Sequence, residues 1–419
     1  MSTAPDRVNG TAAQRVRWGG LGAAGLGTLA CIVGLAAGAA GAFFWAYLVA
    51  YAFWLGLALG SLVLLMLQYL TGGAWSVVIR RILEAGTRTL PLLAVLFVPL
   101  LFGLPHLYEW ARLPLPEGLA GALDAVGLLG TYHSLWPPRT TADPVLEHKS
   151  LYLNVPFSLL RAAVYFAVWL TLAHFLNRWS QRDDEAGRVL HPRRYRLLSA
   201  PGLALYGLTA TFAAIDWLMS LEPHWYSTVY GVLVMVGQVL SGLVFAVVVL
   251  ALVSDRPPLA GVVRPGHLRD LGSLLLAFVM LWAYIAFSQY LLIWAGNLPE
   301  EIPWYLRRTA HGWGAVAGVL ILLHFALPFL MLLSGDVRRS RPALAAVAGL
   351  ILVMRLVEVA WLILPACHAL EDAAALGWLT PAAVLAVGGL WVALFAWELG
   401  KRPLLPVHEP DDVEVSNHG

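Results

Sequence analysis

The chain has 419 residues, of which 59% are hydrophobic and only 12% are charged. Because about a quarter of the residues in an ordinary soluble domain are charged, this composition excludes a water-exposed surface and predicts an integral membrane protein. The 27 basic and 25 acidic residues nearly balance, and the basic ones fall in short separate clusters, which excludes the continuous basic surface that nucleic-acid binding requires.

Ten segments are long and apolar enough to cross a bilayer, which takes about 20 helical residues because each rises about 1.5 Å. They run over residues 19–40, 43–70, 88–107, 152–177, 198–220, 226–253, 270–295, 305–333, 342–366 and 376–399. The interruption between the first two is short, and fusing them would give nine spans. We therefore predict an all-α transmembrane domain over 19–400, between an N-terminal tail, 1–18, and an unstructured C-terminal tail, 401–419.

The distribution of lysine and arginine predicts the orientation of these spans, because basic residues are retained in short cytoplasmic loops. If the N-terminus is cytoplasmic, the inner segments hold twenty basic residues and the outer segments five. The other two, Arg161 and Arg355, fall inside spans. The charge pattern thus predicts that both termini lie in the cytoplasm.

The outer segment 108–151 is too long to be a simple turn. It contains prolines at 114, 116, 137, 138 and 144, together with Trp110 and Trp136. Stiff backbone combined with large aromatic side chains favours a folded cap or a docking surface over a flexible linker.

Four charged side chains lie away from the ends of the predicted spans, where burial in lipid is costly and indicates either a functional site or a pair that holds helices together. Arg355 and Glu358 are three residues apart in the ninth span, so they share a helix face. Asp216 in the fifth span and Arg161 in the fourth are placed to form a second pair. For both pairs a structural role and a role in proton transfer remain open.

Two histidines fall in the predicted eighth span, His311 near the outer surface and His324 near mid-membrane. An imidazole can pass a proton between its two nitrogens, whereas haem ligation would need a matching histidine pair on a partner helix, and none is found. Together with the four charged residues above, these histidines predict a proton pathway at graded depth. Cys31 and Cys367 show no metal-binding spacing, so neither a metal site nor a covalently bound cofactor is expected.

Three stretches near the predicted outer face are more distinctive: EHKSLYLN over 147–154, SLEPHWYSTVYG over 220–231 and FSQYLLIWAGNLPEE over 287–301. They resemble the ActF family of bacterial alternative complex III, which belongs to the NrfD/polysulfide-reductase-like membrane subunits. The resemblance extends over about residues 40–400. It implies two four-helix bundles, made of spans two to five and six to nine, with the first and last spans peripheral.

The resemblance also implies a setting in the bacterial cytoplasmic (inner) membrane, within a quinol:electron acceptor (cytochrome c) oxidoreductase. The expected partners are a multihaem cytochrome c subunit, an iron–sulfur subunit, a related NrfD-like membrane subunit, small membrane subunits and lipids. The family's better-supported quinol site is on the related subunit, so this chain is not expected to be catalytic alone. A quinone, quinol or lipid at the membrane interface stays open as a ligand.

The matching stretches lie where the family's haem and iron–sulfur subunits sit, which predicts an outer docking surface. Its expected residues are His148, Glu222, His224, Glu300 and Glu301. Ordinary loop and helix-cap roles are the alternative for each of them.

These observations predict a subunit that scaffolds a respiratory complex and conducts protons between water and the bilayer interior. One alternative is a direct quinol-binding anchor, which would need an aromatic-lined pocket beside Asp216 and His311. Another is a proton-coupled secondary transporter, which would need inverted repeats and paired broken helices; the proline-interrupted segments around Pro99 and Pro328 keep it open. No catalytic residue is expected, because the chain has no nucleophile motif, phosphate loop or metal constellation.

Overall fold

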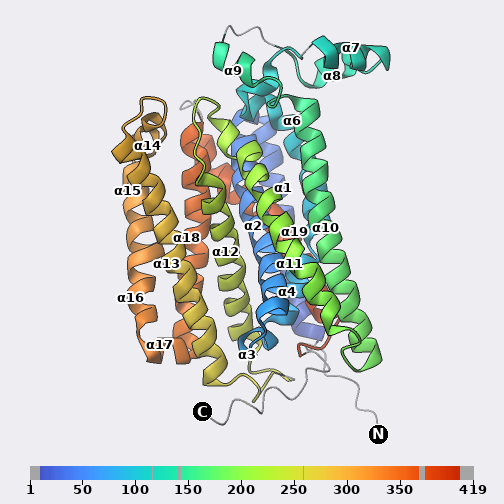
Figure 1. Ribbon diagram of the computed structural model, residues 1–419, viewed down its shortest axis with the longest axis vertical. Helices are drawn as coiled ribbons and strands as arrows, with labels where there is room; N and C mark the ends of the chain where they lie inside the picture. The colour runs from blue at the N-terminus through green and yellow to red at the C-terminus, as the bar shows by residue number, and fades with distance from the viewer. Residues whose placement is uncertain (1–9, 116, 139–142, 258, 368–372, 406–419) are drawn as a thin grey trace.

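The computed structural model describes residues 10–115, 117–138, 143–257, 259–367 and 373–405. These residues form helices and no β-strand, and the long helices run side by side along the long axis of the molecule (Figure 1). Nine of the described helices are long and apolar enough to span a membrane, and a bent pair, Arg80–Leu96 with Val98–Leu107, makes a tenth. The predicted all-α, multi-pass membrane architecture is therefore confirmed.

Short helices separate or interrupt the long ones at several points of the chain. The α-helices are α1 (Gly10–Ala36), α2 (Ala40–Thr71), α3 (Ala74–Val77), α4 (Arg80–Thr87), α5 (Leu90–Leu96), α6 (Val98–Leu107), α7 (Glu117–Ala125), α8 (Leu129–Leu135), α9 (Pro144–Lys149), α10 (Val155–Ala186), α11 (Pro192–Trp217), α12 (Tyr230–Val253), α13 (Pro265–Gly296), α14 (Ile302–Thr309), α15 (Trp313–Val319), α16 (Leu327–Leu333), α17 (Gly335–Arg339), α18 (Arg341–Ile363) and α19 (Ala373–Gly400). Three 3-10 turns are η1 (Glu109–Arg112), η2 (Met219–Leu221) and η4 (Leu364–Ala366), and η3 (Leu320–Ala326) is a π-helix.

The spans form two groups with a peripheral pair. In the first bundle α2 packs on α4, α6 and α11, while α10 packs on α5 and α11. In the second, α12 packs on α13 and α18, and α16 packs on α13 and α18. Contacts of α2 and α11 with α12 join the bundles, and α1 pairs with α19 along the outside of α2. This arrangement agrees with the expected two four-helix bundles and two peripheral spans.

Glycines permit the closest helix crossings. A β-carbon on Gly60 of α2 would overlap the carbonyl oxygen of Gln238 on α12. A β-carbon on Gly27 of α1 would lie 2.5 Å from the carbonyl oxygen of Ala382 on α19. Because lipid provides no hydrophobic force between helices, such close backbone packing is a main source of their association.

The third span is bent by 56° between α5 and α6, and neighbouring side chains bind the carbonyl groups that the bend releases. Tyr47 of α2 donates a 2.7 Å hydrogen bond to the Leu96 carbonyl oxygen, and Tyr51 donates one of 3.1 Å to that of Leu93. Lipid cannot supply such donors, so a break within a span needs partners of this kind.

The described part of segment 108–151 is folded over one end of the bundle, where α7, α8 and α9 lie in Figure 1. Trp110 is buried, and Trp136 Nε1 donates a 2.9 Å hydrogen bond to the Leu101 carbonyl oxygen. That oxygen lacks its usual helical donor because Pro105, four residues later, has no N–H. The described part of this segment is therefore a folded cap, and we call its end of the molecule the cap end.

The opposite end carries both described chain ends, and we call it the terminal end. Arg17 near the start of α1 lies 6.0 Å from the ring of Trp397 near the end of α19. The polar stretch before residue 18 continues α1 from Gly10, so the expected tail is partly helical. Residues 1–9 and 406–419 of the two predicted tails lie outside the described residues.

Two span boundaries are now defined. Gly38, with φ +84°, separates α1 from α2, so the first two spans are not fused. His311 and Gly312, with φ +50° and +87°, separate α14 from α15. The prediction that His311 lies inside the eighth span is therefore wrong: the left-handed conformation of two successive residues ends the helix there.

Candidate functional site

Arg161 of α10 and Asp216 of α11 form a buried ion pair in the first bundle. The Arg161 Nε lies 2.8 Å from Asp216 Oδ2, and Nη2 lies 3.0 Å from Oδ1, so the contact is bidentate. Tyr165 donates a further hydrogen bond of 2.7 Å to Oδ2. Because Asp216 is only 1% exposed, these charge-assisted contacts replace water around the carboxylate. The structure thus brings together the two residues that the sequence placed as a pair.

Aromatic rings hold the Arg161 guanidinium from the side facing the cap end. Its Cζ lies 3.9 Å from the ring centroid of Tyr152 and 4.5 Å from that of Phe157. Its Nη1 donates a 2.8 Å hydrogen bond to the Tyr152 carbonyl oxygen. Asn154 caps the start of α10 by accepting the Phe157 N–H at 2.9 Å, which fixes these rings relative to the helix.

A second buried cluster lies in the other bundle. Arg355 and Glu358 form an ion pair within α18. Trp282 of α13 donates a 2.8 Å hydrogen bond from Nε1 to Glu358 Oε1, and Arg355 Nε donates one of 3.1 Å to Ser241 Oγ on α12. Arg355 and Glu358 are 3% and 2% exposed. Three helices therefore enclose this pair, whose charges are satisfied partly within α18, as the sequence spacing indicated.

His324 completes the second cluster. Its Nδ1 lies 4.0 Å from Glu358 Oε2, and its ring lies edge-on to Trp282 with 4.1 Å between the centroids. The side chain is 0% exposed, and neither ring nitrogen has a hydrogen-bond partner among the described residues. A neutral imidazole held this close to a carboxylate can accept a proton with little movement.

The π-helical geometry of η3 positions His324. Such segments widen the helix by one residue and are frequent at functional sites. Pro328 follows His324 by four residues and has no N–H to donate to its carbonyl oxygen, which favours a local departure from α-helical bonding. This proline was the sequence signal for the irregular segment, although its position alone does not specify a π-helix.

A cavity of about 60 Å³ lies between the two bundles, and both clusters contribute to its wall. Its lining includes Asp216, Arg355 and two polar residues of α12, Gln238 and Ser241, among mostly apolar side chains. Tyr206 donates a 2.7 Å hydrogen bond to Gln238 Oε1 and so orients the amide. A water molecule needs about 10–15 Å³ of such space, so the cavity has room for a few. Asp216 of the first cluster and Arg355 of the second thus line the same space.

The structure does not bring His311 to either cluster. Its side chain is exposed in the turn between α14 and α15, at the cap end. Of the six residues expected in the proton pathway, the other five belong to the two buried clusters.

The expected docking residues differ in exposure. His148, His224 and Glu300 are exposed, and Glu301 is half-buried. His224 Nε2 lies 3.0 Å from Asp143 Oδ2, which ties the loop before α12 to the start of α9. These four residues are accessible to a partner at the cap end.

Glu222 differs from the other expected docking residues, because it is only 5% exposed and so is not accessible to a partner. Its two carboxylate oxygens lie 2.7 Å from Arg307 Nη1 and 2.8 Å from Arg308 Nη1. Arg308 is itself 1% exposed and stacks on Trp304 at 3.7 Å. Burial lowers the pKa of Arg308, and the adjacent carboxylate opposes that shift. Glu222 therefore anchors α14 to the loop before α12.

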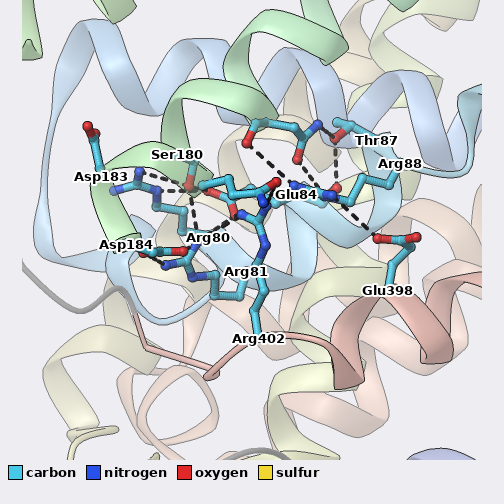
Figure 2. Close-up of polar contacts among 12 residues, drawn as sticks. Arg80, Arg81, Glu84, Thr87, Arg88, Ser180, Asp183, Asp184, Glu398 and Arg402 are labelled. Carbon is cyan, nitrogen blue, oxygen red and sulfur yellow. Dashed lines mark hydrogen bonds and ion pairs between the residues drawn. The ribbon is translucent and has the colours of Figure 1, made fainter. Parts of the chain in front are cut away.

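A third cluster, which the sequence did not reveal, lies at the terminal end (Figure 2). We call it the terminal network; it comprises Arg80, Arg81, Glu84, Ser180, Asp184 and Arg402. Glu84 Oε1 lies 3.1 Å from Arg80 Nε and accepts a 2.7 Å hydrogen bond from Ser180, while Oε2 lies 2.7 Å from Arg81 Nη1. Arg81 also pairs with Asp184. This network joins α4 to α10.

The end of the described chain reaches the same network. Arg402 Nη1 lies 3.7 Å from both Glu84 Oε2 and Asp184 Oδ2. The charge pattern of the sequence places the arginines of α4 in a cytoplasmic loop. In the structure, however, Arg80 and Arg81 are only 5% and 3% exposed. The spacings of Arg80 and Arg81 from Glu84, four and three residues, were the local signals of ion pairs.

No family model matches the chain, and no curated protein matches it. Within the described ranges, no three His, Cys, Asp or Glu side chains are grouped so as to hold a metal ion. The candidate functional site consists of the two buried ionisable clusters and the cavity between them.

Proposed function

We propose that this chain is a membrane subunit of a respiratory quinol:electron acceptor oxidoreductase of the alternative complex III type, in which it scaffolds the complex and conducts protons. The resemblance of its three outer stretches supports the setting. The observation that carries the proton role is the cavity lined by both Asp216 and Arg355. Two ion pairs that only hold helices together would not need to line a shared cavity.

The proposed route runs from the cap end to mid-membrane. Protons pass from Asp216 through water in the cavity to Glu358 and His324. Each carboxylate is held by one guanidinium, so moving that guanidinium away removes the positive charge that keeps the carboxylate ionised and favours proton uptake. Closing the pair again releases the proton. Arg161 and Arg355 thereby act as the movable counter-charges, and electron transfer in a partner subunit would supply the driving charge.

A quinol-binding role at this position is less well supported. The cavity of about 60 Å³ is far smaller than the roughly 300–1,000 Å³ of pockets for organic ligands. His311, which such a site would place beside Asp216, is exposed in a turn. The geometry therefore favours water over a quinol head group between the bundles.

A secondary transporter is also less well supported. Inverted repeats would place broken helices at corresponding positions of the two bundles. The bent span is the second of the first bundle, whereas η3 belongs to the third span of the second bundle. The two irregular spans are therefore not repeat-related.

The test uses the chain carrying a C-terminal tag and purified in mild detergent. The proposal expects a haem-staining cytochrome and an iron–sulfur protein to co-purify and to oxidise quinol. Asp216→Asn, Glu358→Gln and His324→Phe should each keep this composition and lower the protons moved per electron, whereas Asp124→Asn on exposed α7 should not. A haem-free homo-oligomer contradicts the setting, and unchanged proton movement in all three variants contradicts the proton role.

A further inference from the structure

An open groove lies at the terminal end between α4, α5, α10 and α19, separate from the cavity described above. Its volume is about 780 Å³. One part of its wall is basic, with Arg88, Arg178 and His174, and another part is apolar, with Leu170 and Phe175. A groove with a charged and an apolar part fits an amphipathic molecule.

The basic part carries more positive than negative charge. Of the described residues in the groove wall, Glu398 is the one carboxylate, and Lys401 Nζ already lies 2.5 Å from it. Arg88 Nε donates a 3.0 Å hydrogen bond to Asn177 Oδ1 and its Nη2 donates one of 3.4 Å to the Asn177 carbonyl oxygen, while Nη1 forms a long ion pair of 3.5 Å with Glu398 (Figure 2). Arg178 is exposed and makes no ion pair with any described residue. The exposed Arg178 guanidinium is therefore able to bind an anion, and Arg88 adds a second positive charge to the groove wall.

The depth of the basic part matches the membrane surface. His174 lies nineteen residues after Val155, the start of α10, which places it roughly 29 Å along the helix axis. The hydrocarbon core of a bilayer is about 30 Å thick, so a helix that enters it near Val155 leaves it near His174. Arg178 lies one turn further, at the level of lipid head groups.

We infer that this groove is a binding site for an anionic phospholipid. The phosphate contacts Arg178 and is attracted by the positive charge of Arg88, and an acyl chain lies along Leu170 and Phe175. Charge complementarity selects an anionic head group, and the apolar wall distinguishes a lipid from a free phosphate ion. A lipid held here also covers the contact between the first bundle and peripheral α19.

The test compares lipid retention by native mass spectrometry after the delipidated full-length protein has been incubated with phosphatidylglycerol, phosphatidylcholine or inorganic phosphate. Arg178→Gln removes an exposed charge from the groove, and Arg182→Gln removes one from the same helix, one turn away and outside the groove. Thr171→Trp fills the apolar part without changing charge. All three positions are exposed, so each variant should fold.

Phosphatidylglycerol should bind the wild type and Arg182→Gln equally, while Arg178→Gln weakens its binding about fivefold, the effect of one basic residue near a lipid surface. Thr171→Trp should weaken it as well, and phosphatidylcholine should bind poorly throughout. Equal retention by Arg178→Gln and Arg182→Gln would overturn the inference. Retention of inorganic phosphate that persists in Thr171→Trp would also overturn the inference, because the site would then hold a free anion.

Discussion

Arg355 of α18 lies directly against Gly237 of α12, where a β-carbon would overlap the guanidinium Nη2. The same helix supplies Ser241, one turn further on, as the acceptor for Arg355 Nε. The arginine thus reaches the cavity between the bundles because α12 has no side chain at position 237. The candidate route therefore requires a glycine at position 237.

Gly237→Ala should displace Arg355 from the cavity wall. Over-filling a packed interior typically costs about 1–3 kcal/mol, and the guanidinium would also lose its contact with Ser241. We expect lower thermal stability in detergent together with fewer protons moved per electron. Gly349→Ala on α18 is the matched control, since a β-carbon there meets nothing within 4 Å. Equal behaviour of the two variants would argue against the contact.

The Arg161–Asp216 pair should show strong coupling in a double-mutant cycle. Asp216→Leu alone leaves a buried guanidinium without its counter-charge, and Arg161→Met alone leaves a buried carboxylate, each costing about 3–5 kcal/mol. The double variant should be much less destabilised than the sum of the two. Unfolding in detergent measures all four proteins. Additive losses would show that the two charges do not stabilise each other.

The π-helix should be necessary for the position of His324. Deleting Ile321, which is 65% exposed, removes the extra residue of η3 and should restore regular α-helical bonding. His324 lies within η3, so loss of the wide turn changes the direction of its side chain and moves the imidazole away from Glu358. Circular dichroism should show retained helix while proton movement falls. Full proton movement in the deletion variant would contradict a role for the imidazole at this position.

Trp136 should stabilise the cap through the carbonyl oxygen that Pro105 leaves unpaired. Trp136→Phe keeps an aromatic ring but removes the donor to Leu101, and because this contact is only partly buried the cost should lie towards the lower end of the about 1–3 kcal/mol for an unsatisfied buried carbonyl. Limited proteolysis of segment 108–151 should become faster. Trp294→Phe, at a side chain that is 67% exposed, is the control and should change little. Identical cleavage rates would show that this hydrogen bond does not stabilise the cap.

Hydropathy and spacing were sufficient to predict the number of spans and the two charged pairs, whereas the two-bundle arrangement was implied by the family resemblance. Ten apolar segments appear as nine spanning helices and one bent pair in the described chain. Arg355 and Glu358 pair within one helix, so their spacing alone predicted the contact. Arg161 and Asp216 are on successive spans, and their similar depth made a pair reasonable.

The remaining features depend on how helices rotate and on backbone conformation, which hydropathy does not encode. The break at His311 requires a positive φ, which residues other than glycine rarely adopt. Glu222 looked like a loop residue, although Arg307 and Arg308 enclose it. Arg81 looked like a cytoplasmic loop charge, and only the structure shows that it is buried and paired with Asp184 of α10.

The most direct test of the proton route is the number of protons moved per electron by the purified complex in sealed liposomes, followed with a trapped pH-sensitive dye during quinol oxidation. Glu358→Gln removes the carboxylate shared by Arg355, Trp282 and His324 while conserving its shape. The proposed route predicts that this variant assembles and oxidises quinol but moves fewer protons than the wild type and Asp124→Asn. The same ratio in all three proteins would contradict it.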